Sequence, residues 1–361
     1  MRFGISIYPE VTKDIKREKE YLKLAIENGA YRLFINLLDA KDEISRDILE
    51  VIKYAKHLGF MTIADVNPEV LKKLNIKPNE LYKLKNLGLS GIRLDNIYNG
   101  IIEREMTYNE DFKIELNMSA RSEYLDFILM NRPNMKNLIA CHNFYPRPYT
   151  GLSKEHFLKM SKKYKKFGIH TAAFVSIDGG FGPWPIKKNL PTLEEHRFKS
   201  LRSQIKELKA TSLIDDVIIS NCYATKKDFD IINEVLNEEN MTFDLKLLTK
   251  INNYEKEILF NRVHNYRADV SEYQIRSTLF RNDFDKSVFK SKNNIDIACG
   301  HVTIDSCDYP HYSGELQIAL KEMKNSGNVN VLAKIIDEDL CLLEYIKPMM
   351  NFEFKLEREN I

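Results

Sequence analysis

A single pattern repeats eight times between residue 1 and about residue 225 of this chain. Each repeat joins a short apolar run to a polar turn and then to a segment of helical periodicity that ends near Gly or Asn. The eight apolar runs cover residues 3–9, 31–38, 60–66, 91–96, 112–118, 138–144, 170–177 and 216–222. Eight alternations of strand and helix are typical of a closed parallel barrel, for which roughly 250 residues are usual. We therefore predict the α/β class, with a (β/α)8 TIM barrel.

The pattern changes after about residue 240. From there the sequence has short β-like runs separated by turns, at residues 273–279, 294–299, 315–320, 330–336, 341–346 and 351–357. Such runs indicate a separate and smaller all-β domain. A chain of 361 residues is long enough for two domains. We predict a barrel domain at 1–238 and a C-terminal β domain at 245–361, with a linker at 237–245.

Charge and cysteine content exclude several classes of function. The chain has 54 Lys and Arg against 52 Asp and Glu, a formal charge of +2, so we expect neither a nucleic-acid partner nor an anionic membrane surface. No apolar stretch approaches the roughly 18 residues of a membrane span, and the N-terminal sequence has no secretory pattern, so we expect a cytoplasmic protein. Five scattered cysteines without a CxxC pair argue against disulfides and structural zinc, and no motif requires a metal or a cofactor.

Polar residues alternate with apolar ones along two of the predicted strands. Ile92 and Leu94 share one face of the run at 91–96, while Arg93 and Asp95 share the other. The run at 112–118 has the same pattern, with Glu115, Asn117 and then Ser119 on its polar side. If the apolar faces pack on the helices, the polar faces lie inside the barrel near its active end. The alternative is an interior polar layer that only stabilises the barrel.

Acidic residues end three of the first four predicted strands, at Glu10, Asp65 and Asp95. Neighbouring strands are about 4.8 Å apart, so Asp65 and Asp95 are expected to face one bound group across roughly 5 to 9 Å. That range covers both retaining and inverting glycoside hydrolysis by a carboxyl pair. The alternative is that an Asp caps the next helix, although Asn67 is a better cap than Asp65.

The segment CHNFYPRPYTGLS at 141–153 concentrates hydrogen-bond donors on a loop stiffened by two prolines. These donors are His142, Asn143, Tyr145 and Arg147. Arg147 is suited to bidentate capture of a phosphate or carboxylate, the alternative being a surface arginine that bonds a carbonyl. Cys141 and His142 do not form a catalytic pair, because adjacent strand residues point to opposite faces.

Two later segments could also meet an anion. Gly179, Gly180 and Gly182 follow the seventh run, where such barrels often bind phosphate through backbone N–H groups. In LPTLEEHR at 190–197, His196 and Arg197 would attract an anion and Glu194 would repel it. The structural alternative is a capping box formed by Thr192 and Glu195 at the start of a helix.

These segments resemble a known family. GISIYPE, IADVNP, GIRLDN, ELNMS, CHNFYPRPYTGLS, LPTLEEHR and YSGELQI are similar to motif blocks of the bacterial 6-phospho-N-acetylmuramidases of peptidoglycan recycling. The resemblance implies a TIM barrel followed by a cyclophilin-like β domain. It also implies hydrolysis of the β-1,4 bond between N-acetylmuramic acid 6-phosphate and N-acetylglucosamine, without a metal or nicotinamide cofactor. Two places depart from the family: Ser220 and Asn221 replace an expected Gly-Asp pair, and residues 176–189 are divergent.

The leading hypothesis is a glycosidase with Asp65 and Asp95 as the catalytic carboxyl pair and Glu10 in reserve. The expected partner is a small phosphorylated amino sugar, and a homodimer is left open. The expected substrate-binding residues are Arg93, Glu115, Asn117, His142, Asn143, Tyr145, Arg147, Glu194, His196 and Arg197. Two alternatives remain, a TIM-barrel sugar-phosphate isomerase or aldolase and a sugar-phosphate binding protein without activity. A Schiff-base aldolase needs a buried lysine at a strand end, and none of the eight runs ends in one.

Overall fold

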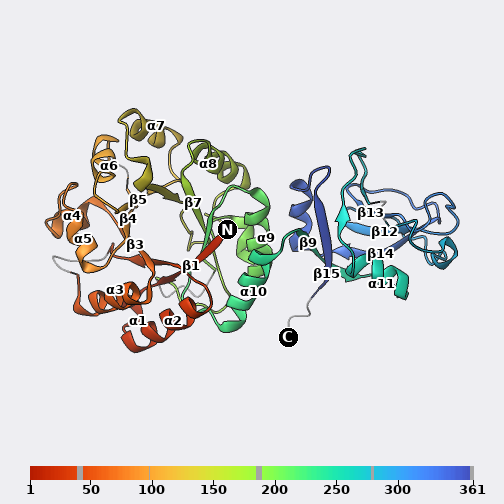
Figure 1. Ribbon diagram of the computed structural model, residues 1–361, viewed down its shortest axis with the longest axis horizontal. Helices are drawn as coiled ribbons and strands as arrows, with labels where there is room; N and C mark the ends of the chain where they lie inside the picture. Colours follow the sequence, from red (N-terminus) through yellow and green to blue (C-terminus); the bar gives the residue numbers. More distant parts are fainter. Residues whose placement is uncertain (39–43, 97, 184–188, 278–279, 358–361) are drawn as a thin grey trace. The chain divides into compact units, whose positions relative to one another are not determined.

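Eight parallel strands close into a barrel in the N-terminal part of the chain (Figure 1). The computed structural model describes residues 1–38, 44–96, 98–183, 189–277 and 280–357. The barrel strands are β1 (Arg2–Ile7), β2 (Arg32–Asn36), β3 (Met61–Val66), β4 (Gly91–Leu94), β5 (Lys113–Asn117), β6 (Leu138–Cys141), β7 (His170–Val175) and β8 (Asp216–Ile219). Each pairs with the next, and β8 pairs with β1. All eight predicted runs therefore contain a strand, and the predicted barrel is confirmed.

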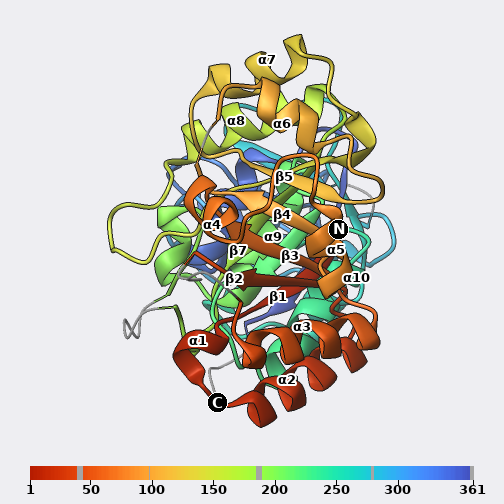
Figure 2. The same cartoon turned by 90° about the vertical axis from the view of Figure 1, so that its left-hand side faces the viewer.

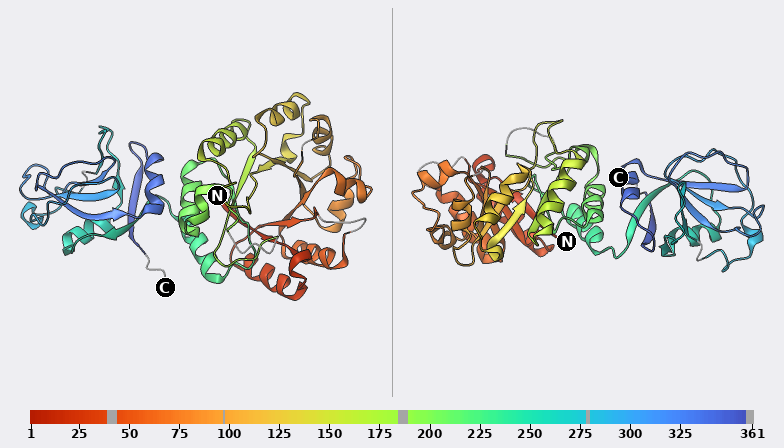
Figure 3. Two further views of the ribbon diagram at one scale, coloured as in Figure 1. Left: turned by 180° about the vertical axis from the view of Figure 1, so that it is seen from behind. Right: turned by 90° about the horizontal axis from the view of Figure 1, so that it is seen from above.

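Helices surround this ring of strands (Figure 3, left). They are α1 (Pro9–Thr12), α2 (Ile15–Glu27), α3 (Arg46–Leu58), α4 (Pro68–Lys73), α5 (Tyr82–Leu87), α6 (Ile101–Met106), α7 (Ser122–Met130), α8 (Lys154–Lys166), α9 (Leu201–Thr211) and α10 (Lys226–Asn237), with short 3₁₀ helices η1 (Met135–Asn137) and η2 (Glu194–Phe198). Figure 2 shows α2 and α3 side by side over the first strands. The outward strand residues Ile92 and Leu94 are buried against this helical layer, as their alternation predicts.

The barrel interior has charged and aromatic layers. Arg32 is fully buried and forms ion pairs with Glu115 of β5 and Asp216 of β8. Above it, the rings of Phe34 and Phe174 meet edge to face, with centroids 5.3 Å apart. The lower part of the barrel is thus a packed core, and any ligand must bind beyond it, at the carboxyl ends of the strands.

Two predicted helix starts have different outcomes. Asn67 caps α4 as expected, because its side chain accepts a hydrogen bond of 2.9 Å from the Val70 N–H. The predicted capping box of Thr192 and Glu195 is wrong, since η2 begins at Glu194 and has no side-chain cap. The Thr192 hydroxyl is used instead in contacts with distant backbone groups.

The chain divides into a second compact unit after Leu236. Its seven-stranded sheet has the order β10-β15-β9-β14-β12-β13-β11. The elements are β9 (Met241–Leu247), α11 (Asn253–Phe260), β10 (His264–Asn265), β11 (Gln274–Ser277), η3 (Lys286–Val288), β12 (His301–Asp305), β13 (Leu316–Ala319), β14 (Val329–Ile335), η4 (Asp337–Glu344) and β15 (Asn351–Leu356). This small all-β domain confirms the predicted class of the C-terminal region.

Several details of the β domain differ from the prediction. The expected linker at 237–245 overlaps β9, which pairs with both β14 and β15 inside the sheet. The run at 341–346 lies in and just after the 3₁₀ helix η4 rather than in a strand. The run at 294–299 contributes only an isolated bridge at Ile297, and strand β12 follows it. Across the described residues of both units, no helix has the length and apolar character needed to cross a bilayer.

Candidate active site

Two acids and one arginine meet at the carboxyl ends of β3 and β4. Asp65 and Arg93 are paired across the two strands, and Arg93 Nη1 lies 2.7 Å from Asp65 Oδ1. Asp95 follows β4 directly, and its Oδ1 lies 3.6 Å from the same nitrogen. The structure therefore brings together the two carboxyl groups that the sequence placed on neighbouring strands, with Arg93 in contact with both.

The two acids differ in their surroundings. Asp65 is only 7% exposed, and burial raises its pKa to about 6, although the neighbouring Arg93 guanidinium acts in the opposite direction. The side chain of Asp95 is 39% exposed and faces solvent. One carboxyl can thus hold a proton close to neutral pH, while the other is accessible to a bound molecule.

Two predicted amides support this pair. The Asn143 side-chain oxygen accepts a hydrogen bond from Arg93 Nη2. Asn117 Oδ1 accepts from the Ser119 N–H at 3.0 Å, and the Ser119 hydroxyl accepts from the Asn143 N–H at 2.8 Å. Ser119 therefore connects the loop after β5 to the loop after β6. The alternation of polar and apolar residues predicted that Ser119 lies on the inward face after β5, but it did not indicate a role for this residue.

An open groove of about 980 Å³ adjoins Asp95. Tyr98 and Phe127 give it aromatic walls, and Arg121 adds a positive charge. Sequence reasoning missed this groove. The residue that could have indicated the groove is Phe127, a large apolar side chain on the solvent side of α7, where it is 56% exposed.

Comparison with known proteins gives a family. A family model described as 6-phospho-N-acetylmuramidase, N-terminal, matches residues 3–234, and one described as 6-phospho-N-acetylmuramidase, C-terminal, matches residues 241–355. The chain belongs to the 6-phospho-N-acetylmuramidase family. No functionally curated protein matches this sequence.

Two solved structures resemble this 6-phospho-N-acetylmuramidase family member along its whole length. An uncharacterized B. cereus protein is 36% identical over 98% of this chain and 99% of its own, with a TM-score of 0.88. A conserved Enterococcus faecalis protein of unknown function is 26% identical over 99% of this chain and 97% of its own, with a TM-score of 0.72. Both similarities extend across the barrel and the β domain.

In this family member, Arg147 stands on the loop after β6. Its side chain is exposed, and no described residue forms a hydrogen bond or an ion pair with the guanidinium. The loop itself is held firmly, because Glu194 accepts hydrogen bonds of 2.7 Å from the N–H groups of Tyr149 and Gly151. A Cβ atom at Gly151 would lie 2.6 Å from Glu194 Oε2, so only glycine permits this approach. A fixed loop thus presents an unpaired cation to solvent.

Glu194 and Arg197 hold this loop in place. Arg197 donates to both carboxylate oxygens of Glu194, each at 2.6 Å, and to the carbonyls of Asn189 and Arg147. The hydrogen-bonded ion pair with Arg197 lowers the pKa of Glu194 to about 2. The Arg197 donors are thus engaged within the loop, and direct contact of Arg197 and Glu194 with a ligand stays a prediction.

Three other predicted binding residues are fully buried. His142 lies between β6 and α8, with Nδ1 at 3.1 Å from the Ser119 hydroxyl and Nε2 at 2.9 Å from that of Ser161. His196 faces Glu207 at 3.1 Å, and Glu115 pairs with Arg32 below the rim. Burial lowers the pKa of both histidines, in His142 to about 3. All three are therefore enclosed by the protein in this structure, and their predicted contact with a ligand stays a prediction.

The remaining predicted residues lie nearer the surface. Tyr145 is half-buried beside Ser119 and Arg93, and burial raises its pKa. Glu10 lies in the first turn of α1, after β1. The binding role of Tyr145 and the reserve catalytic role of Glu10 both stay predictions.

Asn221 has a structural role that the sequence did not indicate. Its side chain accepts from the Ile177 N–H at 3.0 Å and donates to the Ile177 carbonyl at 2.7 Å. It also packs so closely on Gly180 that a Cβ there would collide with it. Asn221 therefore fixes the glycine loop, of which residues 179–182 are described and 184–188 lie outside the described residues.

Proposed function

We propose that this chain hydrolyses the β-1,4 bond between N-acetylmuramic acid 6-phosphate and N-acetylglucosamine, in cytoplasmic peptidoglycan recycling. The observation that carries the proposal is the contact of Asp65 and Asp95 with one Arg93 nitrogen at the barrel rim. The family match supports the choice of substrate. The exposed Arg147 offers a binding partner for the sugar phosphate.

The surroundings of the acids support separate roles. Asp65, with its raised pKa, would protonate the oxygen of the leaving N-acetylglucosamine. Asp95, accessible beside the groove, would attack the anomeric carbon and form a glycosyl-enzyme. Water would then cleave that ester-like bond, with Asp65 now acting as the base. Each step moves one proton between Asp65 and the departing or attacking oxygen.

The separation of the acids is compatible with this retaining course. Arg93 Nη1 lies 2.7 Å from Asp65 Oδ1 and 3.6 Å from Asp95 Oδ1, so the distance between these two oxygens cannot exceed the sum of the two. Retaining glycosidases hold their carboxyl groups about 5 to 5.5 Å apart, whereas inverting enzymes need roughly 6.5 to 9.5 Å to admit a water. The upper limit for this pair of oxygens includes the retaining separation and lies just below the inverting range.

Proton NMR of the disaccharide reaction tests the activity and the stereochemistry together. We expect the full-length protein to release N-acetylglucosamine and the 6-phosphorylated muramic acid, with the β anomer of the latter appearing first. The same disaccharide without phosphate serves as the comparison and should react more slowly. A protein that leaves the phosphorylated disaccharide intact would contradict the proposal, and an α anomer formed first would contradict the roles of the acids.

The Schiff-base alternative finds no support in the barrel. Its eight strands, all of them described, end at Ile7, Asn36, Val66, Leu94, Asn117, Cys141, Val175 and Ile219. No lysine stands at any of these positions to form an imine with a substrate carbonyl. A sugar-phosphate isomerase and a binding protein without activity remain as alternatives, and neither would cleave the disaccharide in the NMR experiment.

A further inference from the structure

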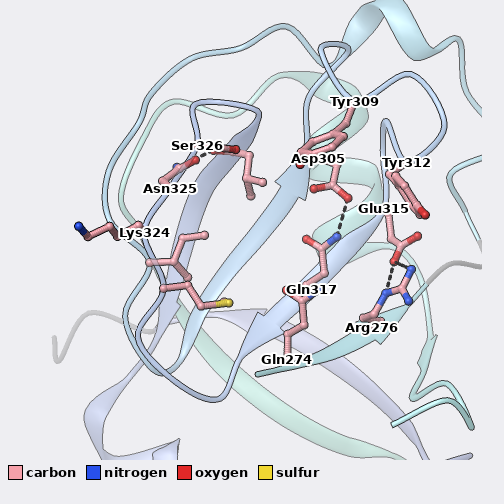
Figure 4. Close-up of a pocket in the computed structure, with 13 residues that line it drawn as sticks. Gln274, Arg276, Asp305, Tyr309, Tyr312, Glu315, Gln317, Lys324, Asn325 and Ser326 are labelled. Atoms are coloured by element: carbon pink, nitrogen blue, oxygen red, sulfur yellow. Dashed lines mark hydrogen bonds and ion pairs between the residues drawn. The ribbon is translucent and has the colours of Figure 1, made fainter. Parts of the chain in front are cut away.

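The β domain contains a separate cavity of about 360 Å³ on one face of its sheet (Figure 4). Arg276 of β11, Gln317 of β13 and Thr303 of β12 lie side by side on this face, as the strand register requires. The opposite face presents apolar residues such as Ile318 to the domain core. These polar side chains border a cavity whose size is typical of small-ligand sites. Such an arrangement indicates a binding surface.

Asp305 forms the polar base of this cavity. It is only 8% exposed, and Oδ2 accepts a hydrogen bond of 2.7 Å from Gln317 Nε2. No described residue donates to the other oxygen, Oδ1, and no described cation forms an ion pair with the carboxyl group. Burial raises the pKa of Asp305 to about 7. A nearly buried carboxyl group that lines a cavity without a second partner is suited to accept hydrogen bonds from a ligand.

The nearby arginines belong to the protein framework. Glu315 is fully buried and pairs with Arg276 at 2.6 Å and Arg281 at 2.9 Å. These two guanidinium groups are therefore engaged by Glu315. Lys324 also lines the cavity, but its amino group points away from Asp305 (Figure 4). The group left with a free hydrogen-bond acceptor at the base of the cavity is the Asp305 carboxyl. The cavity is accordingly better suited to a neutral molecule with hydroxyl groups than to a phosphate or a carboxylate.

The cavity walls are aromatic and apolar. Tyr309 and Tyr312 stand on its rim with ring centroids 6.2 Å apart, and both rings are partly exposed. Ile297, Met323 and Val329 give it an apolar wall. Tyrosine rings offer a flat face for a sugar ring, and an apolar wall accommodates a methyl group.

We infer that this cavity is a second ligand site, which binds the ring of a neutral N-acetylhexosamine. Ring hydroxyl groups donate to Asp305 Oδ1, the ring packs against Tyr309, and the acetamido methyl contacts Met323 and its apolar neighbours. The inference does not depend on the hydrolytic activity, since every residue involved belongs to the β domain.

Saturation-transfer NMR on the full-length protein tests this site with N-acetylglucosamine as the probe. We expect saturable binding, weaker for glucose, which lacks the acetamido group. Asp305→Asn keeps an acceptor for Gln317 but turns an amide donor toward the cavity, so affinity should fall at least about tenfold. Tyr309→Ala should reduce it similarly. Tyr254→Ala, which removes a similarly exposed ring from α11, and Asp95→Asn in the barrel should both retain this binding.

Three results would overturn the inference. One is the absence of saturation by either sugar up to about 10 mM, which corresponds to negligible affinity. The second is binding that is lost in Asp95→Asn but kept in Asp305→Asn and Tyr309→Ala, because the sugar would then occupy the barrel. The third is displacement of N-acetylglucosamine by adenosine with higher affinity and the same dependence on Asp305, which would make the cavity a nucleobase site.

Discussion

Arg93 links the two acids of the candidate active site. It contacts Asp65 and Asp95 through one nitrogen and Asn143 through another. Its positive charge limits how far burial can raise the pKa of Asp65. The residue thus controls the protonation of the proposed acid as well as its position.

This control gives a pH prediction. The proposed acid must be protonated, so kcat of the wild-type protein should fall as pH rises through about 6, the pKa of Asp65. Arg93→Met removes the charge that lowers this pKa, so the alkaline limb should move to higher pH while the maximal rate declines. A pH–rate profile measures both effects. If the alkaline limb of the Arg93→Met profile stays at the wild-type pH or moves to lower pH, Asp65 is not the titrating acid.

Arg147 gives a prediction about substrate choice. Arg147→Ala should lower kcat/KM for the phosphorylated disaccharide by about 10- to 100-fold, the worth of a charge-assisted hydrogen bond. The unphosphorylated disaccharide should lose far less. Arg132→Ala, at another exposed arginine just beyond the C-terminus of α7, is the matched control. Equal losses for the two substrates would show that Arg147 does not bind the phosphate.

Period-two alternation identified part of this site from the sequence alone. It placed Arg93 on the inner face of its strand, and the structure agrees. The same alternation continues for one residue beyond β6. His142 therefore points outward to α8, where its ring packs on Phe157. The donor-rich composition of the loop did not reveal this direction. Arg197 and Glu194 pair locally, three residues apart on η2, whereas the hydrogen bonds of Glu194 to the Tyr149 and Gly151 N–H groups depend on distant parts of the chain and could not be seen in the sequence.

Two segments, the loop after β6 and the stretch before η2, act together as one element. The Thr192 hydroxyl accepts a hydrogen bond of 2.9 Å from the Phe174 N–H and donates one of 2.8 Å to the Asn143 carbonyl. Local sequence suggested a capping box here, but these long-range bonds take the hydroxyl instead. Propensity rules describe neighbours along the chain and do not include such partners.

Removing this hydroxyl should weaken the element. Thr192→Val leaves the buried Phe174 N–H without its acceptor, so we expect the free energy of unfolding to fall by about 1 to 3 kcal/mol. Thr192→Ser retains the hydroxyl and should lose much less. Urea denaturation of both variants measures the difference. If valine and serine are equally tolerated, the hydroxyl does not hold the two segments together.

The fold of the whole molecule was more accessible to sequence reasoning than the site. Strand and helix alternate with strong periodicity in the barrel, so all eight strands were found. The β domain has short strands whose pairing is long-range, and β9 was mistaken for a linker because it follows the polar stretch at 237–240. Where a strand is defined by distant partners, composition alone is a weak guide.

The buried charges inside the barrel provide a test at this scale. Arg32→Met leaves the carboxylate of Glu115 unpaired in the interior, so the free energy of unfolding should fall by about 3 to 5 kcal/mol. The double variant Arg32→Met/Glu115→Gln removes both charges and should recover part of that loss. Denaturation curves followed by circular dichroism compare the three proteins. A double variant no more stable than Arg32→Met would contradict the cost assigned to the unpaired Glu115 carboxylate.

The turnover number of Asp95→Asn on the phosphorylated disaccharide tests the central claim most directly. Asp111→Asn changes an exposed acid between α6 and β5 and serves as the control. We expect Asp95→Asn to fold normally and to lose at least about 10²-fold in kcat, while Asp111→Asn keeps its activity. An Asp95→Asn protein with wild-type kcat would contradict it.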